Sequence, residues 1–418
     1  MRVLVIGAGG VGSAFVAIAA KREVYRHITV ADIDLDKAQA AADSVTGADP
    51  GRIVAARLDA SSEHDVAAMA AEMRADVILN ACDPRFNPSI FDGAFLAGCN
   101  YVDMAMHLSV PHPDKPYEKC GFRLGDGQFA QHPVWKNRGL MALVGMGVEP
   151  GFSDVVARYA ADHLFSEIHE IGVRDGADLV VEGHDFAPTF SIWTTIEECL
   201  NPPVIYERER GWFTTEPFSE PEVFEFPDGI GALECVNVEH EEVILMPRWI
   251  NVDRVTFKYG LGREFIDALK TLRKMNLHST DPVEIGGVQV SPRDVVAALL
   301  PDPAELGTQM HGRTCAGSWV RGLGPDGEAR EVYLYHVVDN AWSMREYHHQ
   351  AVVWQTAVMP AVAIELMATG VWSAIGVVGP EALPPDPFLE LLDQHGVEWD
   401  WQEYRDRKPV EATDAPAI

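Results

Sequence analysis

The chain has 418 residues, of which 47% are hydrophobic, and its formal net charge at pH 7 is −30. This length exceeds what one ordinary hydrophobic core accommodates and predicts two domains, with room for an interleaved third segment. The excess of acidic residues disfavours nucleic acid and anionic membranes as partners, because both carry negative charge. Binding of a small anionic group would depend on a few local arginines and lysines.

The cysteines and the N-terminus bear on the cellular location. The chain has 6 cysteines, scattered without the C-x-x-C spacing of metal or redox sites. This pattern favours free thiols in a reducing compartment, and we expect no metal site. The first residues enter a strand directly, which leaves no room for a cleavable signal. The apolar segment 351–379 is interrupted by polar residues and proline, so we expect a cytoplasmic protein without a membrane span.

The first twelve residues have the pattern of a dinucleotide-binding turn, an apolar strand followed directly by G-x-G-x-x-G. Gly7 permits the tight turn, Gly9 leaves room for a pyrophosphate, and Gly12 lets the next helix pack closely on the strand. The phosphates would lie on free N–H groups at that helix N-terminus. A purely structural turn is the alternative. The predicted cofactor-binding residues here are Gly7, Gly9, Gly10, Val11 and Gly12.

A second predicted strand, residues 28–31, ends at Asp32, 20 residues past Gly12. A carboxylate at this position binds the adenosine ribose hydroxyls and repels a 2′-phosphate. Asp32 and Asp34 together therefore favour NAD over NADP, although Lys37 keeps NADP possible. The alternative is that either aspartate only caps the following helix, because aspartate is a good N-cap.

Strand and helix patterns alternate from residue 1 to about residue 145. Such alternation predicts a parallel sheet covered by helices, with ligands at the carboxyl ends of the strands. The third strand ends near Asp59, where an acidic side chain can meet the adenine edge. The fourth strand ends where the nicotinamide ribose would lie, at Asn80, Ala81 and Cys82.

The pattern changes near residue 149, where half-buried strands separated by turn residues alternate with helical stretches. This predicts an α+β domain with a mixed or antiparallel sheet, and residues 233–246 are expected to form one of its strands. A long apolar helix around Pro360 and a short helix before residue 400 follow. From residue 402 to residue 418 the composition is polar, and we expect a disordered tail.

Several strings across the chain carry a resemblance to a known family. They are GAGGVG (7–12), NYVDMA (100–105), GMGVEPGFSDVVA (145–157), HEEV (240–243), LLPDPAELG (299–307), MPAVAIELMATGVW (359–372) and GVVGPEALPPDPFLELL (376–392). In order and spacing they resemble the saccharopine dehydrogenase superfamily, and within it the carboxynorspermidine dehydrogenase branch. The sequence departs from that branch at residues 355–360 and at the Asp32 and Asp34 pair, which leaves the substrate open.

The resemblance implies a doubly wound Rossmann domain formed by residues 1–147 and completed by about 350–401. An α+β substrate-binding and dimerisation domain, residues 148–349, is inserted between these parts, and a homodimer is expected. The implied activity is NAD(P)-dependent hydride transfer at the C–N bond of an amino-acid-derived secondary amine. Lysine 6-dehydrogenase-like or homospermidine synthase-like activity is an alternative, as is a non-catalytic NAD-binding regulatory protein.

Proton transfer to an amine needs a group that titrates near neutral pH, and histidine is the first choice. In a strand, His240 and Glu242 would share one face, so this pair is the predicted proton-transfer site. A surface strand with solvated carboxylates is the alternative. Asp103, at the end of a parallel strand, is the third catalytic candidate.

Substrate recognition is predicted at two kinds of residue. Glu149, Pro150 and Gly151 lie between a strand and a helix and offer backbone N–H groups at the helix N-terminus, although an ordinary Pro-Gly turn is the alternative. Substrate carboxylates call for cationic side chains, which bind them in charge-assisted hydrogen bonds. The cationic candidates are Arg85, Arg248 and Lys258, each of which has a structural or surface role as its alternative.

Overall fold

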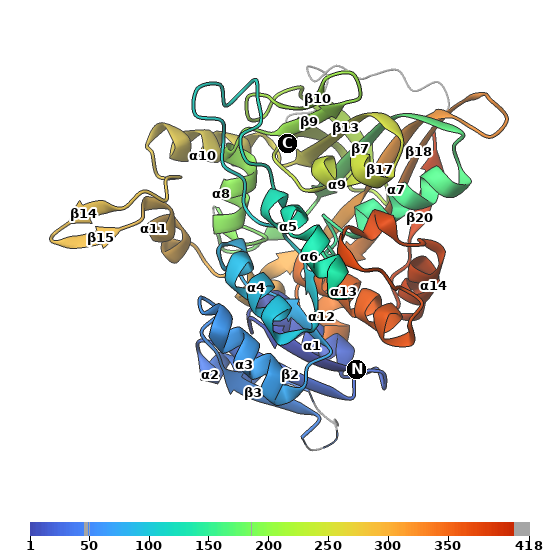
Figure 1. Cartoon of the computed structure of the whole chain (residues 1–418). Coiled ribbons are helices and arrows are strands. Elements are labelled where there is room, and N and C mark those ends of the chain that lie inside the picture. The colour runs from blue at the N-terminus through green and yellow to red at the C-terminus, as the bar shows by residue number, and fades with distance from the viewer. Residues whose placement is uncertain (46–48, 50, 185, 405–418) are drawn as a thin grey trace.

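The computed structural model describes residues 1–45, 49, 51–184 and 186–404. Its two main sheets, of 7 and 9 strands, are flanked by helices (Figure 1). One hydrophobic core includes residues of both sheets. Two further small sheets have two strands each. The predicted α/β fold with a second, mixed sheet is confirmed.

The first sheet is parallel throughout and has the order β19-β6-β5-β4-β1-β2-β3. Without β19 this is the strand order of the doubly wound dinucleotide-binding fold. The order reverses between β1 and β4, and ligands of such sheets bind outside the carboxyl ends of the strands at this point. The strands are β1 Arg2–Ile6, β2 His27–Asp32, β3 Ile53–Arg57, β4 Val77–Asn80, β5 Asn100–Asp103, β6 Met141–Leu143 and β19 Gly376–Val378.

Helices from both ends of the chain cover the first sheet. α13 (Ala351–Thr369) packs against α1 (Gly10–Ala19), which follows the glycine turn. α13 is long and apolar enough to cross a membrane, but 78% of that window is buried inside the protein, as in a core helix. The other helices of this region are α2 Leu35–Asp43, α3 Glu63–Met73, α4 Asn87–Ala97, α5 Asp126–Ala130, α6 His132–Asn137, α12 Asn340–Tyr347 and α14 Asp386–Gln394.

The second sheet is mixed, because β7 (Glu167–Ala177) pairs parallel with β13 (Val252–Gly260) and antiparallel with β17 (Arg313–Leu323). α7 (Phe152–His163) packs on β17, and α9 (Glu242–Trp249) packs on β13. The remaining strands of this sheet are β9 Val204–Glu207, β10 Gly211–Thr214, β11 Glu222–Phe226, β12 Gly231–Asn237, β18 Ala329–Asp339 and β20 Asp400–Glu403.

Smaller elements extend from the second sheet. α8 (Ile192–Leu200) lies beside α10 (Arg263–Lys274) and α11 (Pro292–Leu299), and the hairpin of β14 and β15 projects from this group (Figure 1). The strands of these small sheets are β8 Val180–Val181, β14 Val283–Ile285, β15 Val288–Val290 and β16 Met310–His311.

Two predictions about secondary structure are wrong. Residues 233–246 do not form one strand, because β12 ends at Asn237 and α9 begins at Glu242. The apolar run at the start of α9 is buried on all sides, and periodicity cannot distinguish such a helix from a buried strand. The polar tail does not begin at residue 402, since β20 pairs with β18 through Glu403. The rest of the predicted tail, residues 405–418, lies outside the described residues.

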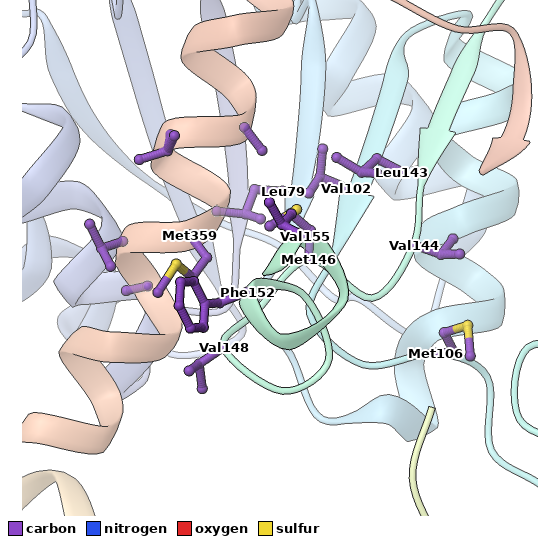
Figure 2. Packing of buried hydrophobic residues seen from close by; sticks show 14 of the residues in the cluster. Leu79, Val102, Met106, Leu143, Val144, Met146, Val148, Phe152, Val155 and Met359 are labelled. Atoms are coloured by element: carbon purple, nitrogen blue, oxygen red, sulfur yellow. The ribbon is translucent and has the colours of Figure 1, made fainter. Parts of the chain in front are cut away.

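The core joins the two sheets at the segment that follows β6. Met146 and Val148 lie in this segment and pack with Phe152 and Val155 of α7 and with Met359 of α13 (Figure 2). Burial of each such side chain contributes about 1.5–3 kcal/mol. The residues between Val148 and Phe152 are therefore held firmly where the two sheets meet.

Candidate functional site

A cavity of about 500 Å³ lies between the carboxyl ends of β1, β4 and β5 and the second sheet. Its position is the one that ligands occupy in doubly wound sheets, and its volume suits a small ligand. The predicted site residues that line the cavity are Gly9, Gly10, Val11, Asn80, Ala81, Cys82, Glu149 and Pro150.

The glycine turn has the shape that a dinucleotide phosphate needs. Gly7 has a φ of 103°, and a Cβ there would lie 2.5 Å from the carbonyl oxygen of Ala81. A Cβ at Gly12 would lie 1.9 Å from the carbonyl oxygen of Gly7. A Cβ at Gly9, in contrast, would meet no described atom within 4 Å. Packing thus requires glycine at positions 7 and 12. Gly9, in contrast, leaves open the space in front of α1 where a pyrophosphate fits.

The carboxylate of Asp32 lies directly beside this turn. Its Oδ2 accepts a hydrogen bond from the backbone N–H of Ala8 (2.8 Å), and its Oδ1 accepts one from Asp34 N–H (3.0 Å). Asp34 itself accepts from the N–H of Asp36 (3.0 Å) as the N-cap of α2, which is its predicted alternative role. Asp32 therefore has the predicted position at the turn, and Asp34 acts on the helix.

Asp59 lies outside the cavity. Its Oδ1 accepts hydrogen bonds from the backbone N–H (3.0 Å) and the hydroxyl (2.6 Å) of Ser61, and these bonds lower the pKa of Asp59. The structure gives this aspartate a place in the turn before α3, and does not bring it to the predicted cofactor residues that line the cavity.

Asn80 holds the loop at the end of β4. Its Nδ2 donates to Asn87 Oδ1 (2.6 Å) and to the hydroxyl of Tyr101 (3.0 Å), while its Oδ1 accepts from Cys82 N–H (3.1 Å). Ala81 and Cys82 are thereby fixed along the cavity wall. Burial raises the pKa of the Cys82 thiol to about 12, so this cysteine lines the site as a neutral group.

The opposite wall of the cavity is acidic. It contains Glu149 after β6, Asp175 on β7, Glu198 on α8 and Glu241 before α9. Burial raises the pKa of all four carboxyl groups, that of Asp175 to about 6. In the described part of the chain, no lysine or arginine lines the cavity. Such a wall is suited to a cation, because buried carboxylates are costly without one.

Glu149 and Asp175 form a hydrogen-bonded carboxyl pair. No N–H or hydroxyl donor of the described residues reaches the buried Oε1 of Glu149. Two ionised carboxylates cannot donate to each other, so this hydrogen bond requires one proton on the pair. Sequence reasoning included Glu149 only as a substrate contact and missed Asp175, because nothing in the pattern of β7 places its side chain opposite residue 149.

His240 and Glu242 are brought together, but behind the cavity wall. His240 Nδ1 lies 2.5 Å from Glu242 Oε2, and the imidazole stacks on Phe257 with ring centroids 3.8 Å apart. Glu242 also accepts from the hydroxyl of Ser153 (3.0 Å) at the N-terminus of α7. Burial lowers the pKa of His240 and raises that of Glu242 to about 8. The chain turns into a helix here, so Glu241 reaches the cavity instead of the predicted pair.

The ligand atoms of His240, Glu241 and Glu242 lie within 4.8 Å of one another, which is the spacing of a metal site. Protein groups already use these atoms, however. Besides the His240 to Glu242 contact, Glu241 Oε1 accepts from the N–H of Met106 (3.0 Å). His240 Nδ1 also lies 3.4 Å from Glu241 Oε2, so the cluster contributes to the position of Glu241.

Asp103 has a structural place at the end of β5. Its carboxylate accepts from the N–H of Gly145 (2.7 Å) and from Gln128 Nε2 (2.6 Å). Burial raises the pKa of Asp103 to about 7. Its neighbours Met104 and Ala105 line the cavity, but Asp103 itself does not.

Arg85 lies just outside the cavity. It forms a fork with Asp83 (Nε to Oδ1 3.0 Å, Nη2 to Oδ2 3.2 Å), and its guanidinium lies 4.3 Å from the ring centroid of Trp193. These contacts satisfy the charge and direct it away from the acidic wall. Gly151 also lies behind the wall, where its φ of 135° lets it approach Gly147 and begin α7.

Lys258 and Arg248 are not brought to the cavity. Side chains alternate along β13, so Tyr259 faces the cavity while Lys258 pairs with Glu222 (2.8 Å) on the other face of the sheet. Arg248 packs over the ring of Phe129, 3.9 Å from its centroid. The structure thus separates all three predicted cations from the acidic wall.

Comparisons with known proteins agree over nearly the whole chain. Residues 3–143 match the family model described as the saccharopine dehydrogenase NADP binding domain, and residues 147–397 match the saccharopine dehydrogenase C-terminal domain. Carboxynorspermidine synthase from Vibrio alginolyticus is 30% identical over 98% of this chain and 99% of the relative. Carboxyaminopropylagmatine dehydrogenase from Synechocystis sp. is 29% identical over 95% of this chain and 96% of the relative.

Among solved structures, saccharopine dehydrogenase (L-Glu forming) from Saccharomyces cerevisiae has the same fold. The TM-score is 0.68 at 14% sequence identity, over 97% of this chain and 100% of that chain.

Proposed function

The chain belongs to the saccharopine dehydrogenase family and is an NAD(P)-dependent oxidoreductase of the C–N bond, and from this premise we propose that its substrate is a carboxylated polyamine. The observation that carries the proposal is the acidic wall formed by Glu149, Asp175, Glu198 and Glu241, with no lysine or arginine among the described residues that line the cavity. The named activities of the relatives support the same class of substrate.

The electrostatic argument distinguishes two kinds of secondary amine. A carboxylated polyamine bears more amino groups than carboxylates, so it enters the cavity as a cation and compensates the buried acids. Saccharopine bears more carboxylates than amino groups, and the wall would repel it. The apolar residues Leu261 and Phe265 also line the cavity and are suited to the methylene segments between the amines.

The cofactor would be held by the wall on the side of the first sheet. The glycine turn and the N-terminus of α1 would hold the pyrophosphate, and Asn80, Ala81 and Cys82 would lie along the nicotinamide ribose. When bound, the nicotinamide ring supplies or accepts the hydride at the C–N carbon. We propose NAD as the preferred form, because the Asp32 carboxylate beside the turn would repel a 2′-phosphate.

The roles of the acidic residues follow from their places. Glu198 and Glu241 bind substrate ammonium groups, since each reaches the cavity from the second domain. His240 and Glu242 position Glu241 from behind. The predicted division into a cofactor domain of residues 1–147 with about 350–401 and an inserted domain of residues 148–349 suits this arrangement.

A substrate panel tests the proposal. Carboxynorspermidine, saccharopine, lysine and putrescine are each scanned for a change in NADH or NADPH absorbance, and kcat/KM is compared. We expect turnover with the carboxylated polyamine and higher activity with NAD than with NADP. A higher kcat/KM for saccharopine would contradict the substrate proposal, and tighter binding of NADPH than NADH would contradict the cofactor preference alone.

We also propose that the protein is a cytoplasmic homodimer that associates through the second sheet. Sedimentation at several concentrations measures the stoichiometry. A monomer at all concentrations would contradict this part of the proposal without affecting the substrate assignment.

A further inference from the structure

We propose that Glu149 and Asp175 are the acid–base couple of the reaction and exchange protons with the substrate nitrogen and with the leaving hydroxyl. The inference rests on the proposed function, since it takes an amine as substrate. Both side chains line the cavity, one from the segment after β6 and the other from β7. They thus lie where the two domains meet and where the C–N bond has to be placed between cofactor and substrate.

The pair differs from the other acids in the cavity because it holds a proton between its two members. The hydrogen bond between Glu149 and Asp175 exists only when one of them is protonated. Burial raises the pKa of Glu149 far above its usual range and that of Asp175 to about 6. The pair therefore offers one proton with which it can act as an acid and one ionised oxygen with which it can act as a base. Glu241, in contrast, already accepts a backbone hydrogen bond.

The surroundings preserve this state. The groups that interact electrostatically with the pair come from every element packed against it, and none is a lysine or an arginine among the described residues. They are Glu198 on α8, Cys235 on β12, His240 and Glu242 around the start of α9, Tyr259 on β13, Cys315 on β17 and Tyr333 on β18. A second negative charge on the pair is disfavoured by the nearby acids, so the pair keeps its single proton.

The proton steps balance in the direction of amine formation. Asp175 takes a proton from the substrate ammonium, and the free amine forms a C–N bond with the carbonyl carbon of the aldehyde substrate. The C=O π bond breaks in this step, and one proton of the attacking nitrogen moves to the oxygen to give a carbinolamine. The pair then returns that proton to the hydroxyl, the C–O bond breaks, water leaves and an iminium forms. After reduction at carbon, the new secondary amine takes one proton from solvent, and the pair ends the cycle with the single proton that it held at the start. In the oxidative direction the same steps run in reverse.

Asp175→Asn and Glu149→Gln test the couple in the full-length protein. We expect kcat to fall about 10²–10⁴-fold in each variant. In the wild type the activity should fall as the pH drops below about 6, because Asp175 becomes protonated, and this limb of the pH profile should be absent in Asp175→Asn. Asp175→Glu should recover part of kcat. Glu167→Gln, at the exposed start of the same strand, is the matched control and should keep both kcat and the pH profile.

The opposite pattern would overturn the inference. If the variants raise KM but keep the wild-type kcat and pH profile, the two residues only bind the substrate. Affinity for NADH or NADPH should be unchanged in both variants, so a folding defect is recognised by its loss.

A measurement without substrate separates this inference from the proposed function. Other buried acids, such as Glu239 and Glu242, also hold protons at neutral pH, so the infrared spectra of the wild type and Glu149→Gln are subtracted. The difference spectrum should contain a carboxylic acid band that is lost with Glu149, and a difference spectrum without such a band contradicts the shared proton. If instead the wild type turns over another amine but no carboxylated polyamine, the substrate proposal fails, and the couple is tested with that amine.

Discussion

The two walls of the cavity are built on different principles. The cofactor wall uses glycines, backbone N–H groups and an asparagine whose hydrogen bonds are satisfied within the first domain. The substrate wall uses carboxyl groups from four separate segments of the chain, and no lysine or arginine of the described residues lines the cavity with them. The first wall selects by backbone shape and the second by charge, so a substitution should affect them in different ways.

The far face of the second sheet shows what the same sheet does when acids are neutralised. Glu222 lies between Arg174 (2.5 Å) and Lys258 (2.8 Å). Burial acts to raise the pKa of Glu222, but these two cations hold that pKa at about 2. On this face the protein itself neutralises the acid. The acids of the cavity have no lysine or arginine beside them among the described residues, so a bound cation would neutralise them.

The largest expected effect is on the cofactor wall. Gly12→Ala would place a Cβ 1.9 Å from the carbonyl oxygen of Gly7, so the backbone of the turn has to shift. A displacement of about 1 Å costs on the order of 100-fold in the rate of a catalysed reaction. We expect a loss of NADH affinity of about the same size by calorimetry, with a lower Tm. Gly9→Ala is the matched control, because its Cβ meets no described atom. It should keep the wild-type Tm while weakening NADH binding, and wild-type affinity in Gly12→Ala would contradict the assignment of this wall.

A smaller effect is expected from removing one charge of the substrate wall. Glu198→Gln should raise KM for a carboxylated polyamine about 10–100-fold, because a charged hydrogen bond contributes about 1.5–3 kcal/mol. NADH affinity should not change. Glu390→Gln, an exposed acid on α14, is the control and should leave KM unaltered. An unchanged KM in Glu198→Gln would mean that α8 does not contact the substrate.

The dependence of stability on pH sharpens the comparison further. Burial raises the pKa of Glu239 and of Glu242 from 4.5 to about 8, so the folded protein keeps protons that the unfolded chain releases. The free energy of unfolding should therefore decrease as the pH rises from 4.5 to 8, by up to about 1.4 kcal/mol per pH unit for each of these groups. Thermal unfolding across this range measures the slope, which Glu239→Gln should reduce.

A polycationic substrate should raise Tm more at pH 8 than at pH 4.5, since it compensates the acids of the cavity wall, such as Asp175, once they are ionised. A Tm that increases between these two pH values in the free protein would contradict the picture of uncompensated buried carboxyl groups.

The smallest effect is expected on the far face. Lys258→Met keeps the buried stem but removes one partner of Glu222, whose side chain is 34% exposed and therefore partly screened by solvent. We expect a loss of about 1 kcal/mol in the free energy of unfolding and an unchanged KM. A clear rise in KM would return Lys258 to the role in substrate binding that the sequence suggested for it.

The positions of site residues could be predicted where they depend on nearby sequence, such as a glycine turn or the end of an apolar strand. The G-x-G-x-x-G turn, Asp32 at the end of the second strand and Asn80 at the end of the fourth are all found at the predicted edge of a parallel sheet. His240 and Glu242 were correctly paired, but their expected exposure to the substrate depended on a strand that is not formed. Lys258 was predicted to bind the substrate but lies on the other face of β13. Which face of β13 meets the cavity depends on the packing of other segments, and the sequence of β13 alone does not show it.

The sequence by itself thus determined the cofactor turn, the parallel sheet and the family, because φ requirements at glycine and the apolar pattern of strands are local properties. Only the tertiary structure decided that Glu149, Asp175, Glu198 and Glu241 share one cavity wall and that the predicted cations lie elsewhere. The physical reason is that the charge and proton affinity of a buried carboxyl group depend on neighbours from distant segments, and packing alone brings those neighbours together.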